Sequence, residues 1–136
     1  MKTNTKNYQL WFYSEKTLYD IATELYNKKL IGAFRYDYEN VFEWVEAPSI
    51  DSSFKFNISR KKAYWGFEEG SVEQKAANLK EPISLALMYT HEEPSDRLLE
   101  EIATQINLTL ACSVYLGAIR YLGGDDFKYI KTKEII

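Results

Sequence analysis

The sequence predicts an α+β fold, with a largely antiparallel sheet of about five to seven strands and two main helices on one face, in a ferredoxin-like or related arrangement. Three observations lead to this prediction. Apolar residues recur at helical spacing in two long segments, whereas several short segments alternate between apolar and polar residues. The 136 residues contain no linker and no internal repeat, and this length is typical of one domain. Residues 1–136 are therefore expected to form a single globular domain.

The first strand and the first helix are predicted from adjacent segments. Residues 8–13 form a short apolar and aromatic run that is typical of a strand. Ser14 follows this run and is a candidate N-cap, because its hydroxyl can accept a hydrogen bond from an unpaired backbone N–H. The helix is expected to end near Lys29, before Gly32. Its apolar residues share one face: Leu18, Ile21, Ala22 and Leu25.

Strand signals dominate the next part of the chain. Between residues 33 and 46 the period changes to two, which predicts a hairpin that turns at Glu39 and Asn40. Residues 54–59 alternate in the same way, and residues 63–67 are a candidate return strand. This part of the chain is therefore expected to supply three or four strands of the sheet.

A short helix and a buried strand are predicted next. Ser71 and Gln74 have the spacing of a capping box, so a helix is expected from there to about Leu79. Residues 83–89 form a continuous apolar run, which is typical of a central strand that is buried on both faces.

The last part of the chain predicts the second long helix and a closing hairpin. Residues 108–116 either extend this helix or form a strand, and their β-branched and aromatic residues favour a strand. Residues 118–122 and 127–131 are predicted to pair around the turn residues 123–126. The helix is predicted from apolar residues that share one face: Leu98, Leu99, Ile102, Ala103 and Ile106.

Charge is distributed unevenly along the chain. The net charge is -3, and residues 69–136 carry eleven acidic but seven basic side chains. Between residues 81 and 101, six carboxylates accompany a single cation, Arg97. Such a segment repels phosphate backbones and attracts basic partners. Acidic residues near a helix start explain part of the same pattern.

The sequence predicts a protein of a reducing, cytoplasmic compartment. Cys112 is the only cysteine, so no intramolecular disulfide can form, and its apolar surroundings predict an inert thiol. Residues 1–7 lack the apolar segment of a signal peptide. No run of residues reaches the length of about 20 apolar residues that a membrane span needs, so no membrane partner is expected.

Patterns for catalysis and cofactor binding are weak. His91 is the only histidine, so a two-histidine zinc site cannot form; with Glu92 and Glu93 beside it, a general base remains an alternative to an exposed loop residue. Asp125 and Asp126 follow two glycines, where turn chemistry is favoured over cation binding. No phosphate-binding glycine fingerprint is present. We therefore expect no cofactor, no metal and no enzymatic activity.

The predicted hairpin of residues 35–46 is the strongest candidate for a partner surface. It interleaves aromatic and acidic side chains, and rings that become buried at an interface anchor a complex while charge steers the encounter. An ordinary amphipathic hairpin is the alternative interpretation. The acidic segment around residue 92 is added to this surface. The candidate residues are Tyr36, Asp37, Tyr38, Glu39, Glu43, Trp44, Glu46, Glu92, Glu93 and Asp96.

These observations favour a small, non-catalytic, intracellular protein-binding protein. The leading hypothesis is an inhibitor or immunity-type protein that neutralises a basic partner, such as a bacterial nuclease toxin. An alternative is a regulatory or catalytic α+β domain that binds a small molecule between its sheet and a neighbouring subunit, in a pocket lined by His91, Asp125 and tyrosines. A homodimer is also left open. A single-stranded nucleic-acid binder is the third hypothesis, on the basic and aromatic residues 54–65, and the overall acidity argues against it.

Overall fold

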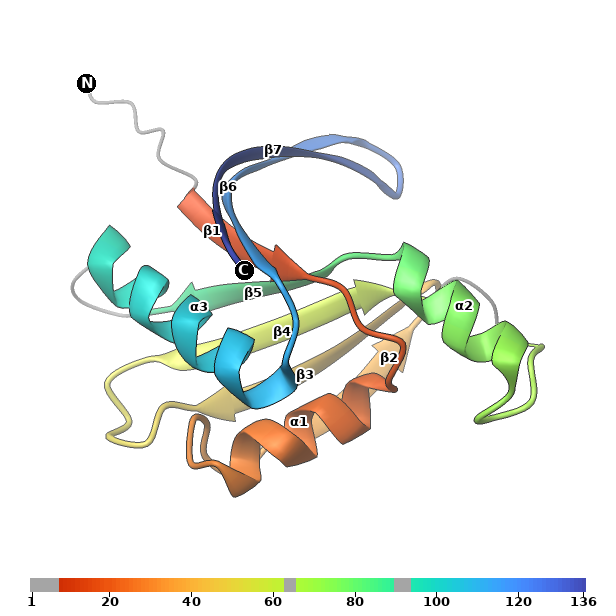
Figure 1. Cartoon of the computed structure of the whole chain (residues 1–136), viewed down its shortest axis with the longest axis horizontal. Coiled ribbons are helices and arrows are strands. Elements are labelled where there is room, and N and C mark those ends of the chain that lie inside the picture. The colour runs from red at the N-terminus through yellow and green to blue at the C-terminus, as the bar shows by residue number, and fades with distance from the viewer. Residues whose placement is uncertain (1–7, 63–65, 90–93) are drawn as a thin grey trace.

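The computed structural model describes residues 8–62, 66–89 and 94–136. Within these residues the chain forms three helices and seven strands, which confirms the α+β class (Figure 1). The helices are α1 (Leu18–Asn27), α2 (Val72–Lys80) and α3 (Asp96–Leu110). The strands are β1 (Tyr8–Phe12), β2 (Arg35–Glu39), β3 (Phe42–Pro48), β4 (Lys55–Lys61), β5 (Ile83–Met88), β6 (Val114–Gly123) and β7 (Asp126–Ile135).

The seven described strands form one sheet in the order β2-β3-β4-β5-β1-β6-β7, and all neighbouring strands are antiparallel. Helix α3 connects β5 to β6, which lie on either side of β1, so this connection crosses β1. The predicted antiparallel sheet is confirmed at the upper end of its expected strand number. The more specific ferredoxin-like assignment stays a prediction.

Helices α1 and α3 cover one face of the sheet and bury its apolar residues (Figure 1). The predicted apolar faces of both helices point into this core, because α1 buries all four of its predicted residues and α3 buries Leu99, Ala103 and Ile106. Leu10 and Phe12 of β1 lie in the centre of the core and are fully buried. Each side chain of this size that is removed from water stabilises the fold by roughly 1.5–3 kcal/mol.

The helix ends follow local hydrogen-bonding chemistry. The N-cap of α1 is Thr17 and not the expected Ser14, because the Thr17 hydroxyl accepts a hydrogen bond from the backbone N–H of Asp20. The Ser14 hydroxyl instead accepts one from the backbone N–H of Lys16, two residues before the first residue of α1. The chain therefore continues past β1 for several residues before α1 begins.

The other two helices differ in how they attach to the sheet. Ser71 caps α2 as predicted, but α2 buries none of its residues and lies beside the sheet (Figure 1). Helix α3 ends at Leu110, and Ala111 adopts a left-handed conformation with φ of 53°. Residues 108–116 are therefore divided between the end of α3 and the start of β6. Of the candidate strand 63–67, residues 63–65 lie outside the described residues and the other two are not in a strand.

The closing hairpin is longer than predicted. Strands β6 and β7 each contain ten residues, and the part of β6 after Ala118 extends beyond its pairing with β1. Figure 1 shows that this free part of the hairpin curves away from the plane of the sheet, on the side away from α1. The register shifts twice along it, between Leu116 and Gly117 and between Tyr121 and Gly123. Such irregularities increase the local bend and twist of a hairpin.

Candidate binding cleft on the open face of the sheet

The face of the sheet opposite α1 and α3, called the open face here, has small residues at its centre. Ser59 of β4 and Ser84 of β5 pair across the two central strands, and their hydroxyl oxygens lie 3.3 Å apart. Large aromatic residues continue the same cross-strand row on both sides: Trp44 of β3, Trp11 of β1 and Tyr115 of β6. The two serines therefore form a low floor between aromatic side chains.

The β6–β7 hairpin covers part of this floor. Tyr129 packs edge-on against Trp11, with ring centroids 5.1 Å apart, and Trp11 is 3% exposed although it lies on the open face. Near the tip of the hairpin, Phe127 packs against Phe42 of β3, with ring centroids 6.3 Å apart. Because the hairpin starts beside β1 and its tip reaches β3, it crosses above the two strands that carry the serine floor.

Gly117 allows the hairpin to take this path. It is buried, it lies at the first register shift of β6, and a side-chain carbon at this position would overlap the carbonyl oxygen of Ile130 in β7. Glycine in a strand interior often marks a place where another part of the backbone approaches closely. The sharp bend of the hairpin therefore depends on the missing side chain at Gly117.

A cleft of about 500 Å³ lies between the hairpin and the open face. Its walls combine residues from distant parts of the chain, because Tyr13 directly follows β1 and Tyr121 lies near the exposed tip of the hairpin. Aromatic rings and small residues thus enclose a space that remains open to solvent. The floor and walls of the cleft also include Phe42, Ser59, Ser84, Ala86, Phe127 and Tyr129.

The cleft is acidic. Five charged residues line it, but the guanidinium of Arg60 points to the other side of the sheet, where it forms an ion pair. The other four are Lys61, Glu81, Asp125 and Asp126. Within the described residues, none of these four belongs to an ion pair. One ammonium group and three carboxylates give a formal charge of -2 at the cleft.

Two phenols of the cleft keep their protons at neutral pH. Burial raises the pKa of Tyr13 and of Tyr129 above the ordinary value of 10.0, and the nearby carboxylate of Glu81 raises both further. Each phenol is therefore a neutral hydrogen-bonding group that also presents a ring face. Glu81 lines the same cleft as both phenols.

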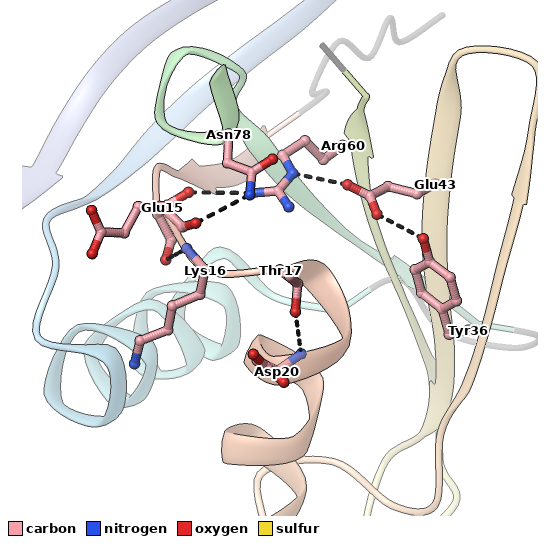
Figure 2. A network of polar contacts seen from close by, with 9 residues as sticks. Glu15, Lys16, Thr17, Asp20, Tyr36, Glu43, Arg60 and Asn78 are labelled. Carbon is pink, nitrogen blue, oxygen red and sulfur yellow. Dashed lines mark hydrogen bonds and ion pairs between the residues drawn. The ribbon is translucent and has the colours of Figure 1, made fainter. Parts of the chain in front are cut away.

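Two residues of the predicted partner surface, Tyr36 and Glu43, form an internal polar network instead (Figure 2). The Glu43 carboxylate accepts a hydrogen bond from Arg60 Nε at 3.0 Å and another from the Tyr36 hydroxyl at 2.9 Å. Arg60 Nη1 also donates to the Ser14 carbonyl oxygen at 3.2 Å. Glu43 therefore does not join an exposed acidic ladder, because Arg60 on the neighbouring strand satisfies its charge inside the protein. Tyr38 lies on the same side of the sheet and is exposed.

The remaining hairpin residues lie on the open face. Asp37 and Glu39 of β2 pair with Trp44 and Phe42 of β3, so acidic and aromatic side chains share this face, and Glu46 belongs to it as well. Phe42 borders the cleft, whereas Trp44 lies beside it on the same face. The predicted mixture of aromatic and acidic side chains is therefore present next to the cleft.

Of the predicted acidic residues near α3, Asp96 is not part of this surface. Asp96 is exposed in the first turn of α3, in the helix layer on the other face of the sheet. Glu92, Glu93 and His91 lie outside the described residues. Asp125 lines the cleft.

Several cleft residues were not singled out from the sequence. Tyr121 and Tyr129 were read as strand residues of a closing hairpin, and Glu81 was counted with the acidic segment. Ile119 and Tyr121 are two positions apart, as are Phe127 and Tyr129, so each pair shares one face of its strand. This spacing indicates an aromatic face on the hairpin. Which surface this face covers depends on the bend at Gly117, and periodicity does not report that bend.

The surroundings of Cys112 in the described part of the chain do not activate its thiol as a nucleophile. It is partly buried, and burial raises the pKa of its thiol, which keeps the reactive thiolate scarce at neutral pH. Residues 8–62, 66–89 and 94–136 contain no cluster of three or more histidine, cysteine, aspartate or glutamate side chains able to hold a metal ion.

Comparisons with known proteins add no relative to this description. The helices of the described residues are too short or too polar to cross a membrane. No protein-family model, no curated protein and no solved structure matches the chain.

Proposed function

We propose that this protein is a non-catalytic binding protein of the cytoplasm that inhibits a basic protein partner, as an immunity-type protein neutralises a nuclease toxin. The observation that carries the proposal is the cleft, where aromatic rings and unpaired carboxylates converge on a surface open to solvent. A segment of the partner would occupy this cleft, and the aromatic and acidic residues of β2 and β3 would extend the contact.

The chemistry of the cleft supports a protein occupant. Aromatic side chains in partly exposed pockets supply much of the binding energy at protein interfaces. Tyr121 at the hairpin tip is 61% exposed, and Phe127 beside it is 40% exposed, so both rings are accessible to a partner. Carboxylates around such rings accelerate the approach of a basic protein and select against acidic ones.

The shape of the open face also supports this proposal. The floor is made of small side chains, so an inserted segment can approach the backbone of β4 and β5. The hairpin crosses above the floor and would contact the segment from the opposite side. An occupant held between two surfaces buries more area than one lying on a flat face, and burial of area is the main favourable term in association.

The proposal is tested by affinity capture from the native lysate. The tagged full chain is expected to retain one abundant basic protein at low salt, in a preparation treated with nuclease, and mass spectrometry identifies it. Association is expected to slow as salt is raised, because screening weakens the attraction between the acidic cleft and a basic partner. Salt-independent association would contradict the charge argument, and the absence of any captured protein would contradict the proposal.

A small molecule is the second candidate occupant. The observation that favours it is the cleft volume of about 500 Å³, which lies within the range typical of small-molecule sites. Native mass spectrometry of protein purified from its own cells distinguishes the two candidates. A bound mass of a few hundred daltons would favour the small molecule, whereas a mass equal to a second copy would indicate the homodimer.

A further inference from the structure

We infer that the cleft holds a cationic side chain of its partner, an arginine or a lysine, between the carboxylate of Glu81 and the rings of Tyr13 and Tyr129. This inference rests on the proposed function, because it names the chemical group that the partner presents to the cleft. It adds a subsite with a defined ligand class, which can be probed without knowing the partner.

A continuous aromatic cluster lies beside the subsite. Trp11 contacts both Tyr115 and Tyr129, with ring centroids 6.2 and 5.1 Å apart. Tyr13 packs edge-on against Tyr115, with ring centroids 6.0 Å apart. The faces of aromatic rings attract cations, and the attraction strengthens where water is partly excluded. Tyr13 and Tyr129 are the members of this cluster that line the cleft, so their rings are the ones that a ligand there can contact.

One cation of the protein itself already lies over a ring of this cluster. The ammonium group of Lys131 in β7 lies 5.5 Å from the centroid of the Tyr115 ring. This distance is within the range of a cation–π contact. The same ammonium group forms an ion pair with the Glu134 carboxylate at 2.9 Å, so the chain itself holds a cation between a ring of this cluster and a carboxylate.

Glu81 supplies a carboxylate at the cleft. It directly follows α2, where its backbone N–H donates to the Asn78 carbonyl oxygen, and its side chain lines the cleft. It lines the cleft together with Tyr13 and Tyr129, and its negative charge contributes to the raised pKa of both phenols. A carboxylate beside aromatic faces combines charge attraction with cation–π attraction, and both favour a guanidinium or an ammonium group.

The charges of the cleft allow the sign of the ligand to be tested. Lys61 is the one ammonium group among the charged residues that line the cleft and are not paired, and it opposes a cationic ligand. Removing Glu81 should weaken the binding of a cation, and removing Lys61 should strengthen it. An anionic ligand would respond to both substitutions in the opposite direction.

The experiment is a titration of the 15N-labelled full chain with N-acetyl-arginine amide, followed by NMR. N-acetyl-citrulline amide serves as the neutral probe, because it keeps the planar shape of the side chain and lacks its charge. The protein variants are Glu81→Gln and Lys61→Met, and Glu73→Gln on the exposed side of α2 is the matched control. The amide spectrum of each variant reports whether its fold is intact before any probe is added.

The arginine probe is expected to shift amide signals of residues that line the cleft. The citrulline probe is expected to bind more weakly than the arginine probe, by a factor of about five or more. Glu81→Gln should weaken the arginine probe about fivefold, Lys61→Met should tighten it, and Glu73→Gln should leave it unchanged. Equal binding of the two probes, an unchanged affinity in Glu81→Gln, the reversed pattern of signs, or no binding by the wild-type chain would overturn the inference.

These outcomes are separate from those of the capture experiment. If the lysate supplies a partner whose binding is the same for the wild type and Glu81→Gln, the inference fails and the proposed function stands. If no protein is captured while the arginine probe binds at Glu81, the proposed function fails on its own measurement.

Discussion

The buried ion pair between Glu43 and Arg60 should be the most sensitive polar contact in the sheet. The Glu43 side chain is 6% exposed and the Arg60 side chain is 2% exposed. We expect Glu43→Gln to destabilise the protein strongly, because the substitution keeps the shape of the side chain and leaves the guanidinium charge buried without its counter-ion. The Arg60 guanidinium also donates a hydrogen bond to the carbonyl oxygen of Ser14, which is adjacent to Tyr13 of the cleft.

The expected size follows from what the contact replaces. Removing one partner of a buried ion pair typically costs about 3–5 kcal/mol, whereas an exposed pair contributes about 0–1 kcal/mol. The hairpin offers a matched control, since Arg35 and Glu46 form an ion pair of similar length, at 3.2 Å, in which the arginine side chain is 82% exposed. Glu46→Gln should therefore cost about 1 kcal/mol or less.

The assay is urea unfolding followed by tryptophan fluorescence and circular dichroism, with the two variants measured beside the wild type. Tyr36→Phe supplies an intermediate step, because it removes one hydrogen bond to the Glu43 carboxylate and should cost about 1.5–3 kcal/mol. The reasoning would be refuted if Glu43→Gln and Glu46→Gln reduced the free energy of unfolding equally. That result would mean that the Arg60 charge reaches solvent when its partner is lost.

Three further predictions concern the hairpin, the tyrosines and a helix cap. Gly117→Ala should cost about 1–3 kcal/mol in urea unfolding and weaken the arginine probe, because the added methyl group displaces the Ile130 backbone; a fully stable variant with unchanged affinity would contradict this. The free energy of unfolding should fall as the pH rises from 10 to about 12, because burial and the Glu100 hydrogen bond raise the pKa of Tyr8 to about 12 and the unfolded chain therefore loses this proton first. The free energies of unfolding of the wild type and Tyr8→Phe, measured with urea, should converge at high pH. Ser95→Ala should lower the free energy of unfolding by about 1 kcal/mol, since it removes the acceptor for the Leu98 backbone N–H at the start of α3.

The apolar face of α1 and the start of α2 were the most predictable parts of the molecule. Helix α1 was predictable because Leu18, Ile21, Ala22 and Leu25 satisfy the helical period, and all four are buried. The start of α2 was predictable because a capping box is a local contact, and the Ser71 hydroxyl does accept from the Gln74 backbone. Both signals depend on residues a few positions apart, and such contacts can be read along the chain.

The faces of the β2–β3 hairpin were harder to predict. Asn40 adopts a left-handed conformation at the turn, with φ of 57°, and the register there places Glu43 on the core side and Trp44 on the open side. An acidic residue on the core side conflicts with simple alternation. It is stable there because Arg60 arrives from a strand seventeen residues away, and the sequence pattern of the hairpin alone does not contain that partner.

The cleft itself could not be predicted from periodicity. It depends on Phe42 meeting Phe127, which are far apart in the chain, and on a backbone contact at Gly117 that bends the hairpin over the open face. A closing hairpin was predicted, but neither its full length nor its path follows from the alternation of its residues. The residues that line the cleft therefore come together only through tertiary packing.

The most direct test of the central claim compares capture by two tyrosine variants of the tagged chain. Tyr121 lines the cleft, whereas Tyr26 lies on α1 in the opposite layer and is 48% exposed, so it is a matched control. If the cleft is where the partner binds, Tyr121→Ala should lose most of the captured basic protein and Tyr26→Ala should retain it. Equal capture by both variants, or loss with Tyr26→Ala alone, would contradict the assignment of the partner to the open face.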